Sequence, residues 1–114
     1  MKFIDLFSGI GGFRLGLESQ GHTCVAYCEI DKFARKSYQT IYDTEGEVEY
    51  HDIRQVTDDQ FRQFRGQVDL ICGGFPCQAF SLAGRRLGFE DTRGILFFEI
   101  ARAAKQIQPR FLFL

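Results

Sequence analysis

The stretch GGFPCQAFS, residues 73–81, presents a cysteine in a setting that suits chemistry better than packing. The run VDLIC just before it, residues 68–72, is apolar and predicts a buried strand. Pro76 fixes the backbone beside Cys77 at the point where the strand ends and a loop opens. A thiol needed only for packing would stay inside the strand, as Cys72 does. The position of Cys77 therefore indicates a reactive thiol at the mouth of a site.

A glycine-rich turn follows the first predicted strand. Gly9, Gly11 and Gly12 leave space for a ligand to approach the backbone and the N–H groups that open the next helix. The dinucleotide pattern GxGxxG has a third glycine where this chain has Arg14, which disfavours NAD or FAD. The alternative interpretation is that these glycines only permit tight packing of the strand against the helix.

Two acidic residues end the next two predicted strands. Glu29 follows Gly9 by about twenty residues, the usual place for a carboxylate that accepts hydrogen bonds from ribose hydroxyls. Asp52 ends the third strand and could accept a hydrogen bond from an adenine amino group. Each acid alone could be a solvated strand-end charge. With the glycine turn they predict a crevice for a nucleoside-containing cofactor without a diphosphate.

Composition restricts the class of protein. The chain has 114 residues, enough for one small domain, and 45% of them are hydrophobic. Fourteen basic and fifteen acidic residues give a net charge of −1, which is not typical of a self-sufficient nucleic-acid binder. We expect a cytoplasmic protein, because the N-terminus lacks a signal-peptide pattern and no run is long and apolar enough to span a bilayer.

The elements that must position these residues alternate between strand and helix. The pattern predicts strands at residues 2–7, 23–30, 48–50, 67–74 and 110–114, and helices at 13–20, 32–42, from 57 onward, and at 94–107. Asp31 and Thr57 have the character of helix N-caps. In the last helix Phe97, Ile100, Ala101 and Ala104 form the expected apolar stripe. Such alternation predicts an α/β fold with a parallel sheet covered on both faces.

Three further features are interpreted from the pattern. Cys24 and Cys28 lie four apart in a strand, so we expect their side chains on one face, as buried thiols and not as a zinc site. Residues 74–94 form a predicted loop of about twenty residues, which indicates either a functional lid or a wrong assignment. The chain stops inside an apolar strand, which suggests part of a longer protein.

The motifs taken together resemble a known family. FIDLFSGIGGFRLGLE, EID, DI, GGFPCQAFSLAG and GFEDTRGILFFEI are similar, in order and spacing, to the first motifs of bacterial cytosine-C5 DNA methyltransferases. The resemblance covers nearly the whole chain. It implies the Rossmann-like doubly wound sheet of S-adenosyl-L-methionine (AdoMet)-dependent methyltransferases, with strand order 3-2-1-4-5 and truncation after the fifth strand.

The resemblance also implies roles for individual residues. Cys77 would be the nucleophile that adds to C6 of a flipped-out cytosine, so that C5 can accept the AdoMet methyl group. The loop that follows would contact the phosphates of double-stranded DNA through Ser81, Arg85, Arg86 and Arg93, although solvated arginines are the alternative. The implied AdoMet-binding residues are Phe7, Gly9, Ile10, Glu29, Ile30, Asp52, Ile53, Gly74 and Leu96. No metal is implied.

Departures from the family pattern limit what these residues could do alone. The Glu-Asn-Val motif, the later arginine motif and the target-recognition domain do not occur in residues 1–114. We therefore interpret the chain as the N-terminal portion of one catalytic domain, inactive by itself, from a DNA methyltransferase of a restriction-modification system. A tRNA cytosine-C5 methyltransferase and a non-catalytic AdoMet-binding or interaction module are the alternatives.

Overall fold

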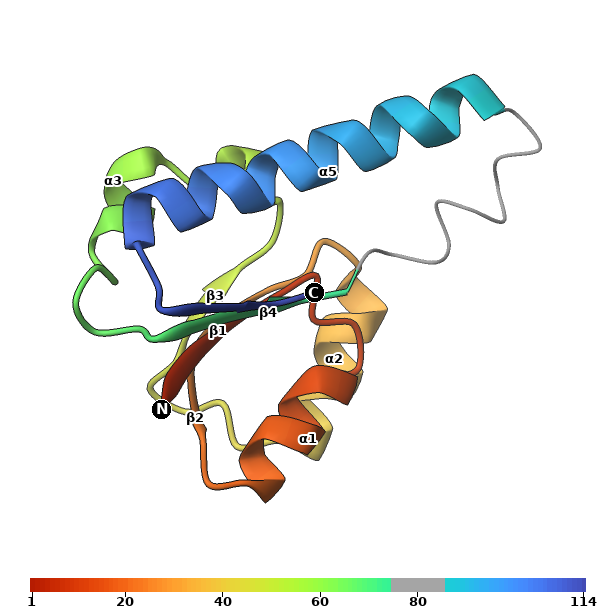
Figure 1. Ribbon diagram of the computed structural model, residues 1–114. Coiled ribbons are helices and arrows are strands. Elements are labelled where there is room, and N and C mark those ends of the chain that lie inside the picture. The colour runs from red at the N-terminus through yellow and green to blue at the C-terminus, as the bar shows by residue number, and fades with distance from the viewer. Residues whose placement is uncertain (75–85) are drawn as a thin grey trace.

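A five-stranded parallel sheet forms the centre of the molecule (Figure 1). The computed structural model describes the backbone of residues 1–74 and 86–114, and the side chains of residues 1–74 and 94–114. The strands are β1 (Lys2–Leu6), β2 (Thr23–Cys28), β3 (Val48–Tyr50), β4 (Leu70–Gly73) and β5 (Phe111–Phe113). Their order is β3-β2-β1-β4-β5, which confirms the predicted 3-2-1-4-5 sheet.

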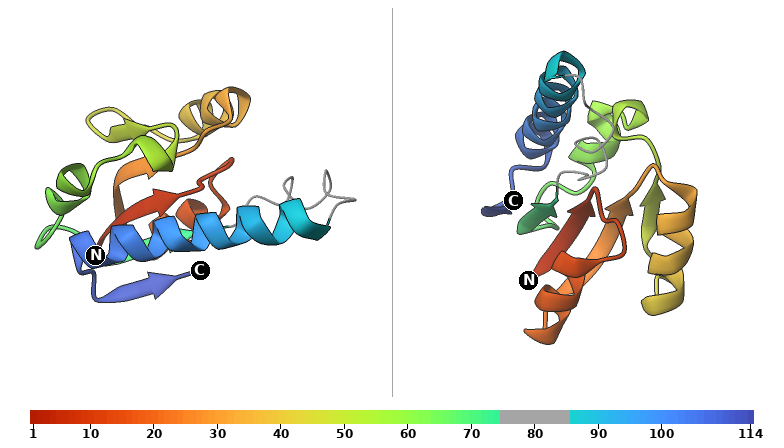
Figure 2. Two further views of the ribbon diagram at one scale, coloured as in Figure 1. Left: turned by 90° about the horizontal axis from the view of Figure 1, so that it is seen from above. Right: turned by 90° about the vertical axis from the view of Figure 1, so that its right-hand side faces the viewer.

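Helices cover both faces of this sheet. Helices α1 (Gly12–Ser19) and α2 (Lys32–Ile41) lie on one face, and α3 (Asp58–Arg62) and α5 (Arg86–Ile107) lie on the other (Figures 1 and 2). A 3-10 turn, η1 (Ile53–Gln55), follows β3. Both predicted N-caps are confirmed: the Asp31 carboxylate accepts a hydrogen bond from the Phe33 N–H, and Thr57 forms a capping box with Gln60. Among the described residues, no helix is long and apolar enough to cross a membrane.

The apolar core is divided by the sheet into two clusters of unequal size. The larger one lies under α3 and α5 and includes Ile4, Phe61, Ile71 and Ile107. The smaller one lies on the α1 side and consists of Phe3, Cys24, Leu70 and Cys72, with Phe13 and Leu17 packed against it. β1 contributes to both clusters because successive residues of a strand point to opposite faces.

The predicted loop over residues 74–94 is too long. α5 begins at Arg86, so residues 86–94 are helical, and the positions of Arg86 and Arg93 belong to this helix. Gly88 and Gly94 do not end the helix, because a glycine inside a helix costs only about 1 kcal/mol. Cooperative propagation from the strongly helical segment that follows explains the extension.

Two side-chain orientations also differ from the prediction. Cys24 and Cys28 lie in different clusters, on opposite faces, because the register of β2 shifts by one residue between Cys24 and Ala26. Such a bulge reverses the alternation of side chains.

The stripe predicted for α5 is wrong in part. Phe97 and Ala101 are exposed, whereas Ile100, Ala103 and Ile107 are buried and Ala104 is half-buried. Apolar residues occur around the whole circumference of this helix, so the periodicity did not select the buried face.

Candidate cofactor site

The turn between β1 and α1 has a backbone conformation that the sequence makes possible. Gly9 and Gly11 have φ values of +55° and +96°, in the left-handed region that glycine tolerates. Phe7 also has a positive φ of 52°, which is strained for a bulky side chain. The Ser8 N–H donates to the Cys28 carbonyl at 3.1 Å and the Gly11 N–H to the Ser8 carbonyl at 2.9 Å. These bonds hold the turn compact at the carboxyl ends of β1 and β2.

Glu29 ties this turn to the end of β2. Its Oε1 accepts a hydrogen bond from the Gly9 N–H at 2.8 Å, and its Oε2 accepts one from the Asp31 N–H at 2.9 Å. Arg35 donates to the carbonyls of Glu29 and Ile30 and fixes the same segment. A carboxylate oxygen has two lone pairs, so each oxygen of Glu29 keeps the capacity to accept a hydroxyl.

Asp52 is already paired with its neighbour Arg54. Its Oδ1 accepts from the Arg54 N–H and Nε, both at 3.0 Å, and its Oδ2 accepts from Nη2 at 2.9 Å. The hydrogen bonds from the Arg54 side chain hold the pKa of Asp52 below its usual range. The carboxylate is therefore an ionised acceptor at neutral pH, with a cation beside it.

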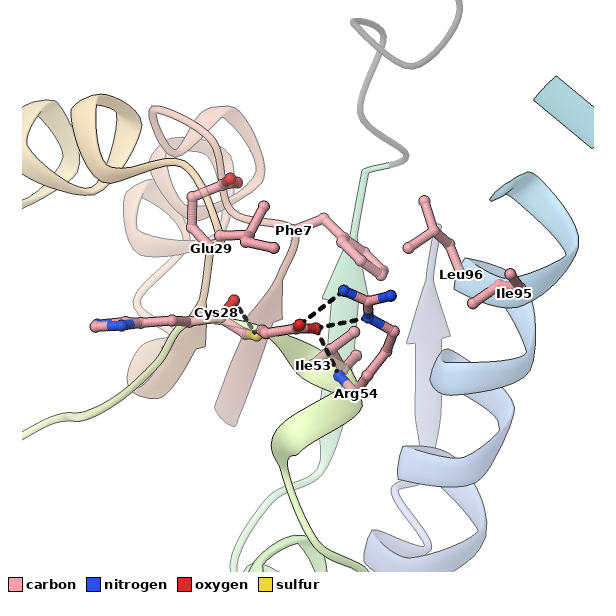
Figure 3. Close-up of a pocket in the computed structure, with 10 residues that line it drawn as sticks. Phe7, Cys28, Glu29, Ile53, Arg54, Ile95 and Leu96 are labelled. Atoms are coloured by element: carbon pink, nitrogen blue, oxygen red, sulfur yellow. Dashed lines mark hydrogen bonds and ion pairs between the residues drawn. The ribbon is translucent and has the colours of Figure 1, made fainter. Parts of the chain in front are cut away.

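These strand ends and α5 enclose a pocket of about 310 Å³. That volume is at the lower end of the range for small-molecule sites. In Figure 3 the side chains of Phe7 and Leu96 point toward the same space from the end of β1 and from α5. Glu29 and Asp52 supply anionic groups to an otherwise mostly apolar lining. The full lining is Phe7, Cys28, Glu29, Ile30, His51, Asp52, Ile53, Arg54, Ile95 and Leu96.

The pocket brings together most of the residues predicted to bind a cofactor. The six that line it are Phe7, Glu29, Ile30, Asp52, Ile53 and Leu96. Gly9 and Ile10 do not line the pocket. Gly9 lies in the turn and donates its N–H to Glu29, and the Ile10 side chain is 64% exposed. Gly74 follows β4, and a Cβ placed there would lie 3.3 Å from the Phe13 ring.

Four lining residues were not predicted: Cys28, His51, Arg54 and Ile95. Each is the direct chain neighbour of a predicted residue. Their position in the chain next to Glu29, Asp52, Ile53 or Leu96 was the signal that could have identified them. In a strand followed by a turn, a neighbour can contact the same ligand.

The three cysteines with described side chains are packing residues. Cys24, Cys28 and Cys72 are all buried, and burial raises the pKa of Cys24 and of Cys28 to about 12. Burial also raises the pKa of Cys72, and Asp5 adds to that effect. These thiols stay protonated at neutral pH and are poor nucleophiles. The predicted burial of Cys24 and Cys28 is confirmed.

The predicted nucleophile and part of the predicted DNA loop lie outside the described residues. These are Cys77, Ser81 and Arg85; the side chains of Arg86 and Arg93 are likewise not described. β4 ends at Gly73, which pairs with Leu6 next to the glycine turn, so β4 ends at the edge of the sheet that holds the pocket.

Several features of the site fit a nucleoside with a charged tail. Phe7, Ile30, Ile53 and Leu96 give apolar walls for a base, and the Glu29 carboxylate can accept ribose hydroxyls. The buried Ser8 hydroxyl, in the glycine turn, has no hydrogen-bond partner among the described residues. A Cβ at Gly9 would meet no atom within 4 Å, so the turn is open on that side.

Comparison with known proteins identifies a family. The family model for the C-5 cytosine-specific DNA methylase matches residues 1–114. The Type II methyltransferase M.HhaI of Haemophilus parahaemolyticus is 46% identical over 114 residues, which are 100% of this chain and 33% of that protein. The Type II methyltransferase M.Eco47II of Escherichia coli is 51% identical over 109 residues, covering 96% of this chain and 25% of the relative.

A phage protein and a solved structure extend the comparison. The orphan methyltransferase M.SPRI of Bacillus phage SPR is 41% identical over 97% of this chain and 25% of its own length. A crystal structure of a prophage-encoded E. coli protein, named as a DNA modification methyltransferase, has a TM-score of 0.74 and 28% identity over 98% of this chain and 30% of that one. The chain thus spans about a third or less of the length of the relatives described here.

Proposed function

Because the chain belongs to the family of C-5 cytosine-specific DNA methylases, we propose that its protein transfers a methyl group from AdoMet to C5 of cytosine in double-stranded DNA. The observation that carries the proposal is the pocket at the strand ends. There Glu29, Asp52 and the apolar walls offer the contacts that the nucleoside part of AdoMet needs. Bound AdoMet supplies an electrophilic methyl group on its sulfonium.

The contribution of each residue follows from its place in the pocket. Glu29 accepts hydrogen bonds from the ribose hydroxyls while it holds the Gly9 N–H. Ile30, Ile53 and Leu96 pack against the base, and Asp52 accepts from the adenine amino group. Gly9, Ile10 and Gly74 do not line the pocket, and they are proposed to border the methionine part of AdoMet. Phe7 supplies the remaining wall through its strained backbone position.

Cys77 is the proposed nucleophile. Its thiolate adds to C6 of a cytosine flipped out of the helix, which makes C5 nucleophilic toward the methyl group. Loss of the C5 proton and departure of the thiolate then restore the aromatic ring. Ser81, Arg85, Arg86 and Arg93 are proposed to contact DNA phosphates. The buried cysteines cannot replace Cys77, since burial raises their thiol pKa values.

Residues 1–114 are proposed to form the N-terminal portion of the catalytic domain. The relatives are about three times as long or longer, and we place target recognition outside these residues. A role in restriction-modification is supported by the Type II relatives and predicts a cytoplasmic enzyme.

A methyl-transfer assay with the complete protein tests this function. Tritium-labelled AdoMet is incubated with DNA or with tRNA, and the products are digested to nucleosides. We expect labelled 5-methylcytosine from DNA, its loss in Cys77→Ala, and its retention in the matched variant Cys24→Ala. Label in tRNA alone would support the RNA enzyme instead. Absence of transfer to either, with AdoMet bound, would support a non-catalytic module.

A further inference from the structure

Arg14, the residue that departs from the dinucleotide pattern, is one of the most buried side chains in the described part of the molecule. It is 2% exposed, and its guanidinium binds the Glu47 carboxylate at 2.7 and 2.8 Å. It also donates to the Tyr38 hydroxyl at 3.1 Å and to the Asp43 carbonyl at 3.2 Å. Burial acts to lower the pKa of Arg14, but the hydrogen bonds to Glu47 and Tyr38 outweigh it. Arg14 is thus a fixed cation.

This cation supports the side chain of Tyr42. The Arg14 guanidinium lies 4.8 Å from the centre of the Tyr42 ring, within the range of a cation–π contact. The Tyr38 ring, in α2, lies 5.1 Å from the Tyr42 ring. Tyr42 is the C-cap residue that follows α2, and its N–H donates to the Tyr38 carbonyl at 2.9 Å. Backbone and ring of Tyr42 are therefore both held in place.

Tyr42 in turn contacts the glycine turn at Gly11. Its hydroxyl donates to the Gly11 carbonyl at 2.6 Å. A Cβ at Gly11 would lie 2.3 Å from Cε2 of the Tyr42 ring, so the ring fills the space that a side chain would need. The same carbonyl accepts the Leu15 N–H at 2.9 Å, in the first turn of α1. Tyr42 thus fixes both the turn and the start of the helix.

Side chains consequently hold the turn at two points. Glu29 binds the Gly9 N–H from the side of β2, and Tyr42 binds the Gly11 carbonyl from the side of α2. We propose that Tyr42, supported by the Arg14–Glu47 ion pair, is a positioning residue that sets the glycine turn for AdoMet. This inference rests on the proposed function, and it assigns a role in cofactor affinity to a residue that does not line the pocket.

The proposal predicts a selective effect on the cofactor. Without the hydroxyl, the Gly11 carbonyl loses one of its two partners, and the turn samples conformations in which its N–H groups are misdirected. AdoMet then binds only the fraction of molecules whose turn has the competent conformation, and this raises the Kd for AdoMet. We expect the KM for AdoMet to rise while kcat and the KM for DNA stay unchanged. A merely structural role would lower thermal stability without this selectivity.

The test compares two tyrosine hydroxyl deletions in the complete protein. Tyr42→Phe removes the bond to Gly11, and the control Tyr27→Phe removes a hydroxyl that binds Glu49 and Gln39 at the β3 side of the sheet. Calorimetric titration with AdoMet measures each Kd, and thermal unfolding measures each Tm. We expect a roughly three- to fivefold higher Kd for Tyr42→Phe, the worth of about one hydrogen bond, and no change for Tyr27→Phe.

Each outcome decides the proposal. A Kd for Tyr42→Phe equal to that of the wild type would overturn it, as would an equal rise in Tyr27→Phe. A rise confined to Tyr42→Phe, at a Tm like that of the control, would support it. Failure of the wild type to bind AdoMet would instead refute the proposed cofactor itself. Hydrogen exchange of the Leu15 amide, faster in Tyr42→Phe alone, gives a second readout that needs no ligand.

Discussion

The two faces of the sheet bury different chemistry. Among the described residues, the face under α3 and α5 buries a cluster of thirteen residues with apolar side chains or thiols, whereas the face under α1 and α2 buries a cluster of four. Beside the smaller cluster lies a polar network that joins Asp5, Arg14, Tyr38 and Glu47. The Tyr38 hydroxyl donates to Asp5 at 3.0 Å and accepts from Arg14 at 3.1 Å.

Because of this difference, the apolar cluster contributes mainly to stability and the polar network mainly to the geometry of the glycine turn. Apolar burial is non-directional and roughly proportional to area, so it stabilises the fold without fixing a particular orientation. Hydrogen bonds within a buried network are directional, and each donor or acceptor left unpaired costs free energy. The larger cluster therefore holds the sheet and helices together, while the network sets the turn that borders the pocket.

The largest expected effect comes from the apolar face, far from the pocket. Ile107→Ala removes a fully buried side chain at the end of α5 and should lower the free energy of unfolding by about 2–4 kcal/mol. The same change at Ile41, which is 57% exposed, is the matched control and should cost less than about 0.5 kcal/mol. Chemical denaturation measures both. Equal losses would show that the larger cluster does not dominate stability.

A comparable loss of stability is expected when Arg14, the cation of the polar network, is replaced. Arg14→Met leaves the Glu47 carboxylate without its cation and removes one of the partners of the Tyr38 hydroxyl, and should cost about 2–4 kcal/mol. Unlike Ile107→Ala, it should also weaken AdoMet binding, because Tyr42 loses its support. The double variant Arg14→Met, Glu47→Gln should recover at least about 1 kcal/mol relative to additivity in a double-mutant cycle. Strict additivity would exclude coupling within the pair.

The network also predicts a dependence on pH. Burial raises the pKa of Asp5 to about 6, against the lowering effect of hydrogen bonds with Tyr38 and Cys72. Because the folded-state pKa exceeds the ordinary value of 3.8, the contribution of Asp5 to stability is fully present below about pH 4. It is lost as the pH rises through 6.

The matched variant for this prediction is Asp5→Asn, which cannot ionise. Relative to it, the wild type should lose on the order of 2–3 kcal/mol between pH 4 and pH 7. Unfolding free energies of both proteins across this range give the difference, in which the other titrating groups cancel. A difference that stays constant with pH would contradict the raised pKa.

The smallest expected effect is a difference in stability between alanine variants at the two glycines of the turn, Gly9 and Gly11. Alanine at Gly9 meets only backbone strain, whereas alanine at Gly11 also meets the Tyr42 ring. Gly11→Ala should therefore cost about 1–2 kcal/mol more than Gly9→Ala. In a Tyr42→Ala background the gap should shrink. Thermal unfolding of the four single and double variants measures it, and an unchanged gap would show that the ring is not the obstacle.

Local patterns in the sequence predicted the parallel sheet and the acidic strand ends, whereas the strand order and the apolar pocket residues were implied by the resemblance to a family. Strand–helix alternation dictates a parallel sheet, and the acidic strand ends identify Glu29 and Asp52. What these patterns could not predict depends on contacts far apart in the chain. The bulge in β2 arises from pairing with β1, and the partner of Arg14 lies 33 residues away. From the sequence alone, Arg14 was therefore interpreted only as the residue that departs from the GxGxxG pattern.

Covalent trapping tests the central claim most directly. The complete protein is incubated with AdoMet and with DNA whose target carries 5-fluorocytosine, and adducts are separated by denaturing electrophoresis. Fluorine at C5 cannot leave as a proton does, so the thioether at C6 stays in place after methyl transfer.

The proposed function predicts a stable protein–DNA adduct that depends on AdoMet, maps to Cys77 by peptide mass analysis and is absent in Cys77→Ser. Cys24→Ser, which changes a buried thiol, should still form the adduct. An adduct that persists in Cys77→Ser, or one that maps to another residue, would contradict the assignment of Cys77 as the nucleophile.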